Sequence, residues 1–231
     1  MSTIVPGATR LGPSLTGEAS ESLRFEKWLP TLLSVIAGMV DLISFLSLGI
    51  FTAHITGNIV VIGALVVRHG RVNLAQILSI PVFIVAVAAT WLLAKASRKQ
   101  GHSLMRFLLL VQFLLLACVL VFSVLTNPSA NPHGLMAGIA AMMAVSAMAC
   151  QFALLRLTLP VVPSTAVMTG NLTNAVLSLA AGDTGRLKAS LHLLIGFFVG
   201  CVVAAAAISP LGEWAWLFPA VLAGATVALV K

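Results

Sequence analysis

Six blocks of almost uninterrupted apolar residues run through the chain, and each is long enough to cross a bilayer as a helix. Such a crossing takes about 17 to 25 residues. The blocks are Leu32 to Leu48, Leu74 to Leu93, Phe107 to Leu125, Leu135 to Leu155, Leu191 to Ile208 and Trp214 to Val230. In lipid every backbone N–H and C=O must find a partner within the protein, and the alternating pattern of a membrane β-barrel is absent. The sequence therefore predicts an all-α membrane protein.

Composition leaves little material for a water-soluble domain. Only 8% of the residues are charged, whereas a soluble domain carries about a quarter. The segment 1–28 begins with a stretch rich in Ser, Thr, Gly and Pro, and we expect it to be a disordered tail. Beyond it we expect a first membrane repeat over 29–126, an external loop over 127–133 and a second membrane repeat over 134–231.

The distribution of positive charge predicts the orientation of the spans. The net charge is +7, and four of the basic residues, Lys95, Arg98, Lys99 and Arg106, lie in one short loop. The loop 127–133 contains no Lys or Arg. Because short cytoplasmic loops are enriched in Lys and Arg, the first loop is expected inside and the second outside. An even number of spans then places both termini in the cytoplasm.

An internal repeat divides the chain into two halves. The segment Phe51–Asn58 (FTAHITGN) returns as Ser164–Asn171 (STAVMTGN), with Thr, Ala, Thr, Gly and Asn at the same five places. Each copy follows a long apolar block and precedes a shorter one. Internal repeats of this kind are typical of transporter folds.

Two topologies are compatible with this repeat. If the short stretch after each Thr-Gly-Asn is a half-helix that enters and returns, the chain has six spans plus two short segments, arranged as two inverted three-span repeats. Only Arg68 and Arg71 then violate the charge rule. The alternative has eight spans and parallel repeats, which places Arg68 and the Lys95–Arg106 loop on opposite sides. We favour the six-span topology.

The chain also resembles a known family. Asp41 followed by Phe45, Gly49, Phe51 and then Thr56-Gly57-Asn58 is similar to the signature of the YoaK family (domain of unknown function 1275), bacterial integral membrane proteins of unknown function. The second Thr-Gly-Asn matches too, and the resemblance covers roughly Leu29 to Val230. The resemblance implies a multi-pass protein of a bacterial inner (cell) membrane. The family pattern implies a Gln-Asn pair ahead of the second copy. Here Gln151 is followed by Phe152, so Gln151 is the candidate site residue at that place.

Asp41 is the acidic residue that lies deep in an apolar block. A carboxylate there raises the free energy of insertion by about 2.5 to 3.5 kcal/mol, so it normally faces a cavity or a cationic partner. We expect a proton or cation site, and the alternative is an ion pair that only fixes helix packing. Arg156, near the end of the fourth block, is the expected partner.

The two Thr-Gly-Asn triplets, Thr56-Gly57-Asn58 and Thr169-Gly170-Asn171, have the chemistry of helix starts. In inverted halves they could direct the positive ends of two helices at one midplane site that favours an anionic or polar solute. The alternative is close helix packing through small residues. His54 is a candidate proton relay or an interfacial hydrogen-bonding group.

These features favour a small-solute transporter or channel. A non-transporting membrane binding or scaffold protein is the alternative, and a polar cavity that meets both motifs would distinguish them. Soluble catalytic motifs such as a phosphate-binding loop are absent, so we expect neither an enzyme nor a cofactor or metal. The expected partners are the lipid bilayer and the solute, without nucleic acid, and a homo-oligomer is compatible with the sequence.

Overall fold

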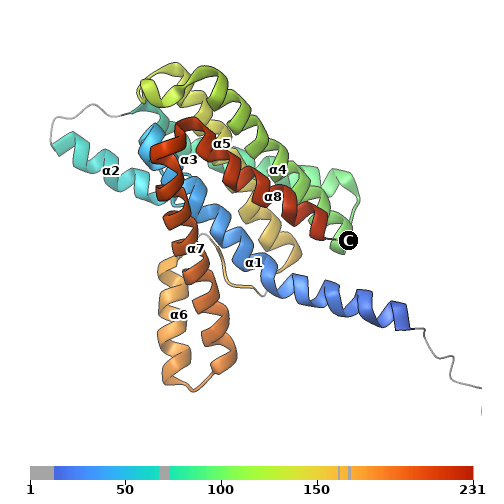
Figure 1. Cartoon of the computed structure of the whole chain (residues 1–231). Coiled ribbons are helices and arrows are strands. Elements are labelled where there is room, and N and C mark those ends of the chain that lie inside the picture. The colour runs from blue at the N-terminus through green and yellow to red at the C-terminus, as the bar shows by residue number, and fades with distance from the viewer. Residues whose placement is uncertain (1–12, 68–72, 161, 166–167, 231) are drawn as a thin grey trace, which may run out of the picture.

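The computed structural model describes residues 13–67, 73–160, 162–165 and 168–230, and in these ranges it contains helices and no strand. Eight α-helices and two short 3-10 helices follow one another (Figure 1). Their bounds are α1 (Pro13–Leu48), α2 (Ile55–Val67), α3 (Leu74–Ser97), α4 (Gly101–Thr126), η1 (Pro128–Ala130), α5 (Leu135–Thr158), α6 (Met168–Ala180), α7 (Thr184–Leu211), η2 (Gly212–Trp216) and α8 (Leu217–Leu229).

Five stretches are long and apolar enough to cross a membrane, and they make the chain a multi-pass integral membrane protein. They lie at Trp28–Leu48, Leu74–Ser97, Gly101–Thr126, Leu135–Thr158 and Thr184–Leu229. The last stretch has 46 residues and contains α7, η2 and α8. The helices α2, α6 and α8 have 13 residues each, which is about 20 Å of helix and less than a usual crossing. The helix α8 follows directly on η2, whereas α2 and α6 have no such extension among the described residues.

The helices of one half pack mainly on helices of the other. The helix α1 packs against α7 and α8, while α5 packs against α3 and α4. The short helices stay near their sequence neighbours, α2 against α3 and α6 against α7. The spans of α1 and α5 form the centre, because 67% of the most apolar window in each is buried, against 17% to 33% in the other three stretches.

Glycines let α1 and α7 approach until their backbones touch. A Cβ atom added at Gly200 of α7 would overlap the carbonyl oxygen of Val35, and one added at Gly38 of α1 would overlap the carbonyl oxygen of Phe197. A Cβ atom at Gly196, one turn before Gly200, would lie 2.9 Å from the carbonyl oxygen of Thr31. Small residues spaced four apart are a common way for helices to pack in lipid, where apolar side chains gain little by leaving the solvent.

The start of α1 differs from the expected tail. The helix begins at Pro13, so residues 13–28 are helical where composition predicted disorder. Proline suits the first turn of a helix because its missing N–H has no partner there in any case. Residues 1–12 lie outside the described part of the chain, as do Arg68 and Arg71.

Candidate functional site

After α1 the chain reverses and runs back along the helix it has just left. The helix α1 ends at Leu48, and Gly49 has a φ of +69°, a conformation that glycine adopts without strain. The next residues, 49–54, form the first return segment. In it the ring of Phe51 stacks on the ring of Phe45, with 4.6 Å between the ring centroids. Thr52 then reaches Asp41, seven residues before the end of α1. Because seven residues of helix span about 10 Å, α2 starts well inside the depth that α1 crosses.

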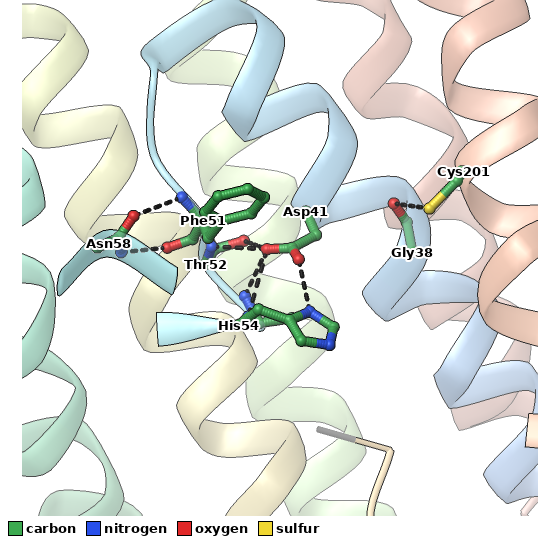
Figure 2. Close-up of polar contacts among 8 residues, drawn as sticks. Gly38, Asp41, Phe51, Thr52, His54, Asn58 and Cys201 are labelled. Carbon is green, nitrogen blue, oxygen red and sulfur yellow. Dashed lines mark hydrogen bonds and ion pairs between the residues drawn. The ribbon is translucent and has the colours of Figure 1, made fainter. Parts of the chain in front are cut away.

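Asp41 holds this return segment (Figure 2). Its Oδ1 atom accepts hydrogen bonds from the backbone N–H groups of Thr52 at 2.7 Å and Ala53 at 2.8 Å. Its Oδ2 atom lies 2.7 Å from Nδ1 of His54. The carboxylate is 4% exposed and stands at the start of α2, where the helix dipole favours negative charge. Asp41 therefore supplies the hydrogen bonds that the non-helical backbone needs in lipid.

The partner of Asp41 differs from the expected one. In the described part of the chain its ion pair is with His54, and the side chain of Arg156 is exposed in the last turn of α5. The expectation of an Asp41–Arg156 pair was wrong because His54 lies only 13 residues along the chain, where the return segment brings it directly to the carboxylate. A charge near a span end, such as that of Arg156, reaches water instead of a buried partner.

His54 links the buried carboxylate to a more open region. Its side chain is 30% exposed, and its ring meets the ring of Phe197 on α7 edge-on, at 5.0 Å between centroids. With Nδ1 engaged by Asp41, Nε2 has no hydrogen-bond partner among the described residues. The pair has one buried carboxylate and one partly exposed imidazole, which is a geometry that can pass a proton between the protein interior and its surroundings.

The two motif asparagines, Asn58 and Asn171, have the same structural role. The side-chain amide of Asn58 donates to the carbonyl of Phe51 at 2.8 Å and accepts from the N–H of Phe51 at 2.8 Å. Asn171 donates to the carbonyl of Ser164 at 2.8 Å. Both bonds join residues seven apart, and both asparagines are buried. Each amide thus fastens a short helix to the segment before it.

The two buried threonines of the motifs are not the two that the sequence predicted as site residues. Thr52 and Thr165 are fully buried, whereas Thr56 and Thr169, the predicted site residues, are exposed. Gly57 lies against the ring of Phe51, because a Cβ atom there would be 3.0 Å from Cδ2. Both pairs of threonines are repeated identically, so the motif alone did not distinguish them.

Gln151 occupies in the second half the place that Asp41 occupies in the first. It lies seven residues before the end of α5, and its Nε2 atom is 3.4 Å from the hydroxyl of Thr165. The same amide donates to the carbonyl of Leu33 on α1 at 2.8 Å and accepts from Gln112 on α4 at 2.7 Å. Leu33 precedes Asp41 by eight residues, so the two sites are separated by about 12 Å along α1. Gln112 completes the site but was not predicted as part of it.

A family model described as "Protein of unknown function (DUF1275)" matches residues 29–229. The chain belongs to the DUF1275 family. The match includes both copies of the motif together with Asp41 and Gln151, as the resemblance in the first motif predicted. Comparisons with curated proteins and with solved structures gave no match.

Three cavities of this DUF1275 chain lie away from the Asp41–His54 pair. One of about 590 Å³ lies between α6 and α7, and two of about 550 Å³ and 540 Å³ lie between α3, α4 and α5. Asp41, His54 and Thr52 line none of these three. None of these three cavities is therefore the expected polar cavity that meets both motifs. The first return segment is held by hydrogen bonds within the protein.

Proposed function

We propose that this membrane protein is a small-solute transporter or channel in which Asp41 and His54 control the first return segment. The observation that carries the proposal is that one buried carboxylate binds both the backbone at the start of α2 and a partly exposed imidazole. A proton that reaches Asp41 replaces charge-assisted hydrogen bonds by neutral ones, which are roughly half as strong. The start of α2 is then held less tightly, so proton binding is linked to movement of the return segment.

The proposed topology has six spans, two re-entrant helices and two inverted halves, with both termini in the cytoplasm of a bacterial cell. Contacts between α1 and α7 correspond to those between α5 and α3, as a two-fold relation between the halves requires. The 46-residue stretch Thr184–Leu229 corresponds to about 69 Å of helix, enough for two crossings, and α8 turns away from α7 at η2 (Figure 1). The alternative with eight spans needs α2 and α6 to cross with 13 residues each, whereas α8 has 13 residues and is lengthened by the 5 residues of η2.

Labelling of single cysteines tests this topology. A cysteine at Pro160, before α6, and one at Gly182, after it, should react with an impermeant reagent from the same side of the membrane. Cysteines at Gly49, before α2, and at Arg68, after it, should share the opposite side. Each variant is made in a background from which Cys118, Cys150 and Cys201 have been removed. Labelling of Pro160 and Gly182 from opposite sides would support eight spans and exclude re-entry of α6.

Transport is tested with purified protein in liposomes that contain a pH-sensitive dye. We expect a small anion or polar solute, tested as phosphate, succinate and glutamate, to drive proton movement with wild-type protein. Asp41→Asn should reduce the rate at least about tenfold while the protein stays folded, because amide oxygen still accepts from Thr52 and Ala53. His54→Gln should also slow it, and Arg156→Gln is the matched control that should not. Unchanged proton movement in Asp41→Asn would reject the proposal.

A membrane scaffold is the second candidate, and the hydrogen bonds of the motifs favour it. The amides of Asn58 and Asn171 are both used to hold backbone, and neither lines one of the three cavities. If wild-type protein moves neither protons nor any tested solute, the scaffold becomes the better reading. In either case the proposal is for a protein without catalytic activity that acts in the bilayer, as a monomer or a homo-oligomer, and not on nucleic acid.

A further inference from the structure

The surface of the cavity between α6 and α7 is mostly apolar, but several polar side chains that neither motif explains reach it. It is an open groove of about 590 Å³ near the turn that joins the two helices. In Figure 1 these helices form a hairpin that projects from the other spans. Polar side chains enter the cavity from both helices and from the turn: Asn174, Ser178, Asp183, Arg186 and Ser190.

Two of these side chains belong to buried serines in the wall of the cavity. Ser190 is 1% exposed and Ser178 is 7% exposed, and neither hydroxyl has a hydrogen-bond partner among the described residues. Elsewhere Ser146 and Thr158 bond the carbonyl four residues earlier in their own helices. Asn174, which is exposed in the cavity wall, likewise has no partner in the described part of the chain. The two hydroxyls and the Asn174 amide therefore offer hydrogen-bond donors and acceptors to an occupant of the cavity.

The charged groups at the rim favour an anion. Asp183 accepts from the N–H of Arg186 at 3.0 Å, which caps α7, and its other oxygen lies 3.4 Å from Nε of Arg186. The terminal nitrogens of Arg186 have no partner among the described residues. Their planar pair of donors matches the two oxygens of a carboxylate or phosphate. Lys188, two residues later, is an exposed cation outside the cavity lining.

The first half has no counterpart of this lining. When the two motifs are aligned, Asn174 corresponds to Val61 and Ser178 to Leu65. The polar groups are therefore a property of α6 itself and do not follow from the repeat.

We propose that the α6–α7 cavity binds a small carboxylate or phosphate anion, free or as the headgroup of an anionic lipid. Arg186 binds the charge, and Asn174, Ser178 and Ser190 hydrogen-bond to the oxygens. The inference concerns binding alone and does not depend on proton movement at Asp41. Failure of transport would leave it standing, and failure of binding would leave the Asp41 proposal standing.

Ligand-induced stabilisation of the full chain in neutral detergent tests the site. The probes are inorganic phosphate, succinate and a short-chain phosphatidylglycerol, each compared with sodium chloride at equal ionic strength. We expect at least one probe to raise the Tm of the wild type, and its Kd to increase at least tenfold in Arg186→Gln and in the double variant Ser178→Ala/Ser190→Ala. Lys188→Gln removes the same charge outside the cavity lining and should leave the Kd within twofold.

The pattern of responses identifies the source of the anion. Stabilisation by phosphate or succinate assigns the site to a free anion, and stabilisation by phosphatidylglycerol alone assigns it to a lipid headgroup. If none of the probes raises the Tm, the proposal is wrong. It is also wrong if Lys188→Gln weakens binding as much as Arg186→Gln, because surface charge would then be the whole effect.

Discussion

Replacing Asp41 by alanine is expected to lower the thermal stability of the protein more than any single change within the first return segment, residues 49–54. The substitution leaves the N–H groups of Thr52 and Ala53 without an acceptor in a buried position. Hydrogen bonds to a charged group contribute about 1.5 to 3 kcal/mol each, so the loss is about 3 kcal/mol or more. For a chain of this length that is a decrease in Tm of roughly 6 to 12 °C, measured by thermal unfolding in detergent.

Two further variants separate the hydrogen bonds from the charge. Asp41→Asn keeps an acceptor oxygen and should lose only about 1 kcal/mol. Arg156→Ala changes an exposed side chain and should leave the Tm within about 1 °C, as most surface substitutions do. If Asp41→Ala melts like the wild type, the carboxylate does not hold the return segment, and the role assigned to Asp41 is wrong.

Adding one methyl group at Gly200 is expected to separate α1 from α7. The Cβ atom of Gly200→Ala would overlap the carbonyl oxygen of Val35 and lie 3.0 Å from the backbone nitrogen of Met39. Backbone atoms cannot rotate away as side chains do, so the helices must move apart along the Gly38 and Gly196 contacts. We expect a loss of about 3 kcal/mol and a lower yield of monodisperse protein, measured by size-exclusion chromatography after heating.

Gly138→Ala on α5 is the matched control, because it is the same substitution in a span with no atom within 4 Å of the new Cβ. Alanine has the higher helix propensity by about 1 kcal/mol, so this variant should be as stable as the wild type or more stable. The two glycines should thus respond with opposite signs. Equal behaviour of both variants would mean that backbone contact between α1 and α7 does not hold the halves together.

The class of the fold could be predicted from the sequence because lipid permits few solutions. Apolar blocks such as Leu74 to Leu93 and Phe107 to Leu125 fall within α3 and α4. The packing of helices from one half on helices from the other could not be predicted. Hydropathy indicates which segments lie in lipid, but it does not indicate which helices are neighbours. The glycines at 38, 196 and 200 are a signal for close packing, but glycine at such spacing also occurs where helices do not meet.

At the candidate site, the sequence indicated Asp41 through its cost in lipid, and His54 through its place in the motif. It did not indicate that the carboxylate binds backbone, because backbone donors have no sequence signature. His54 is closer to Asp41 along the chain than Arg156 is, and this favours it as the partner of the carboxylate. A search for opposite charge alone led to Arg156. Gln112, Ser178 and Ser190 could not be singled out, since polar residues of this kind occur in many spans as packing groups.

The packing of α1 on α7, a helix of the other half, determines which contacts can form first during synthesis. The hydroxyl of Ser34 on α1 donates to the carbonyl of Leu193, 159 residues later in the chain. At about 5 to 20 residues per second, a ribosome needs roughly 10 to 30 s to synthesise these residues. During that time α1 has no α7 to pack against. Thr52 lies only 11 residues after Asp41. The return segment can therefore cover the side chain of Asp41 almost as soon as both are synthesised. The contact of Gly38 with α7 can form only much later.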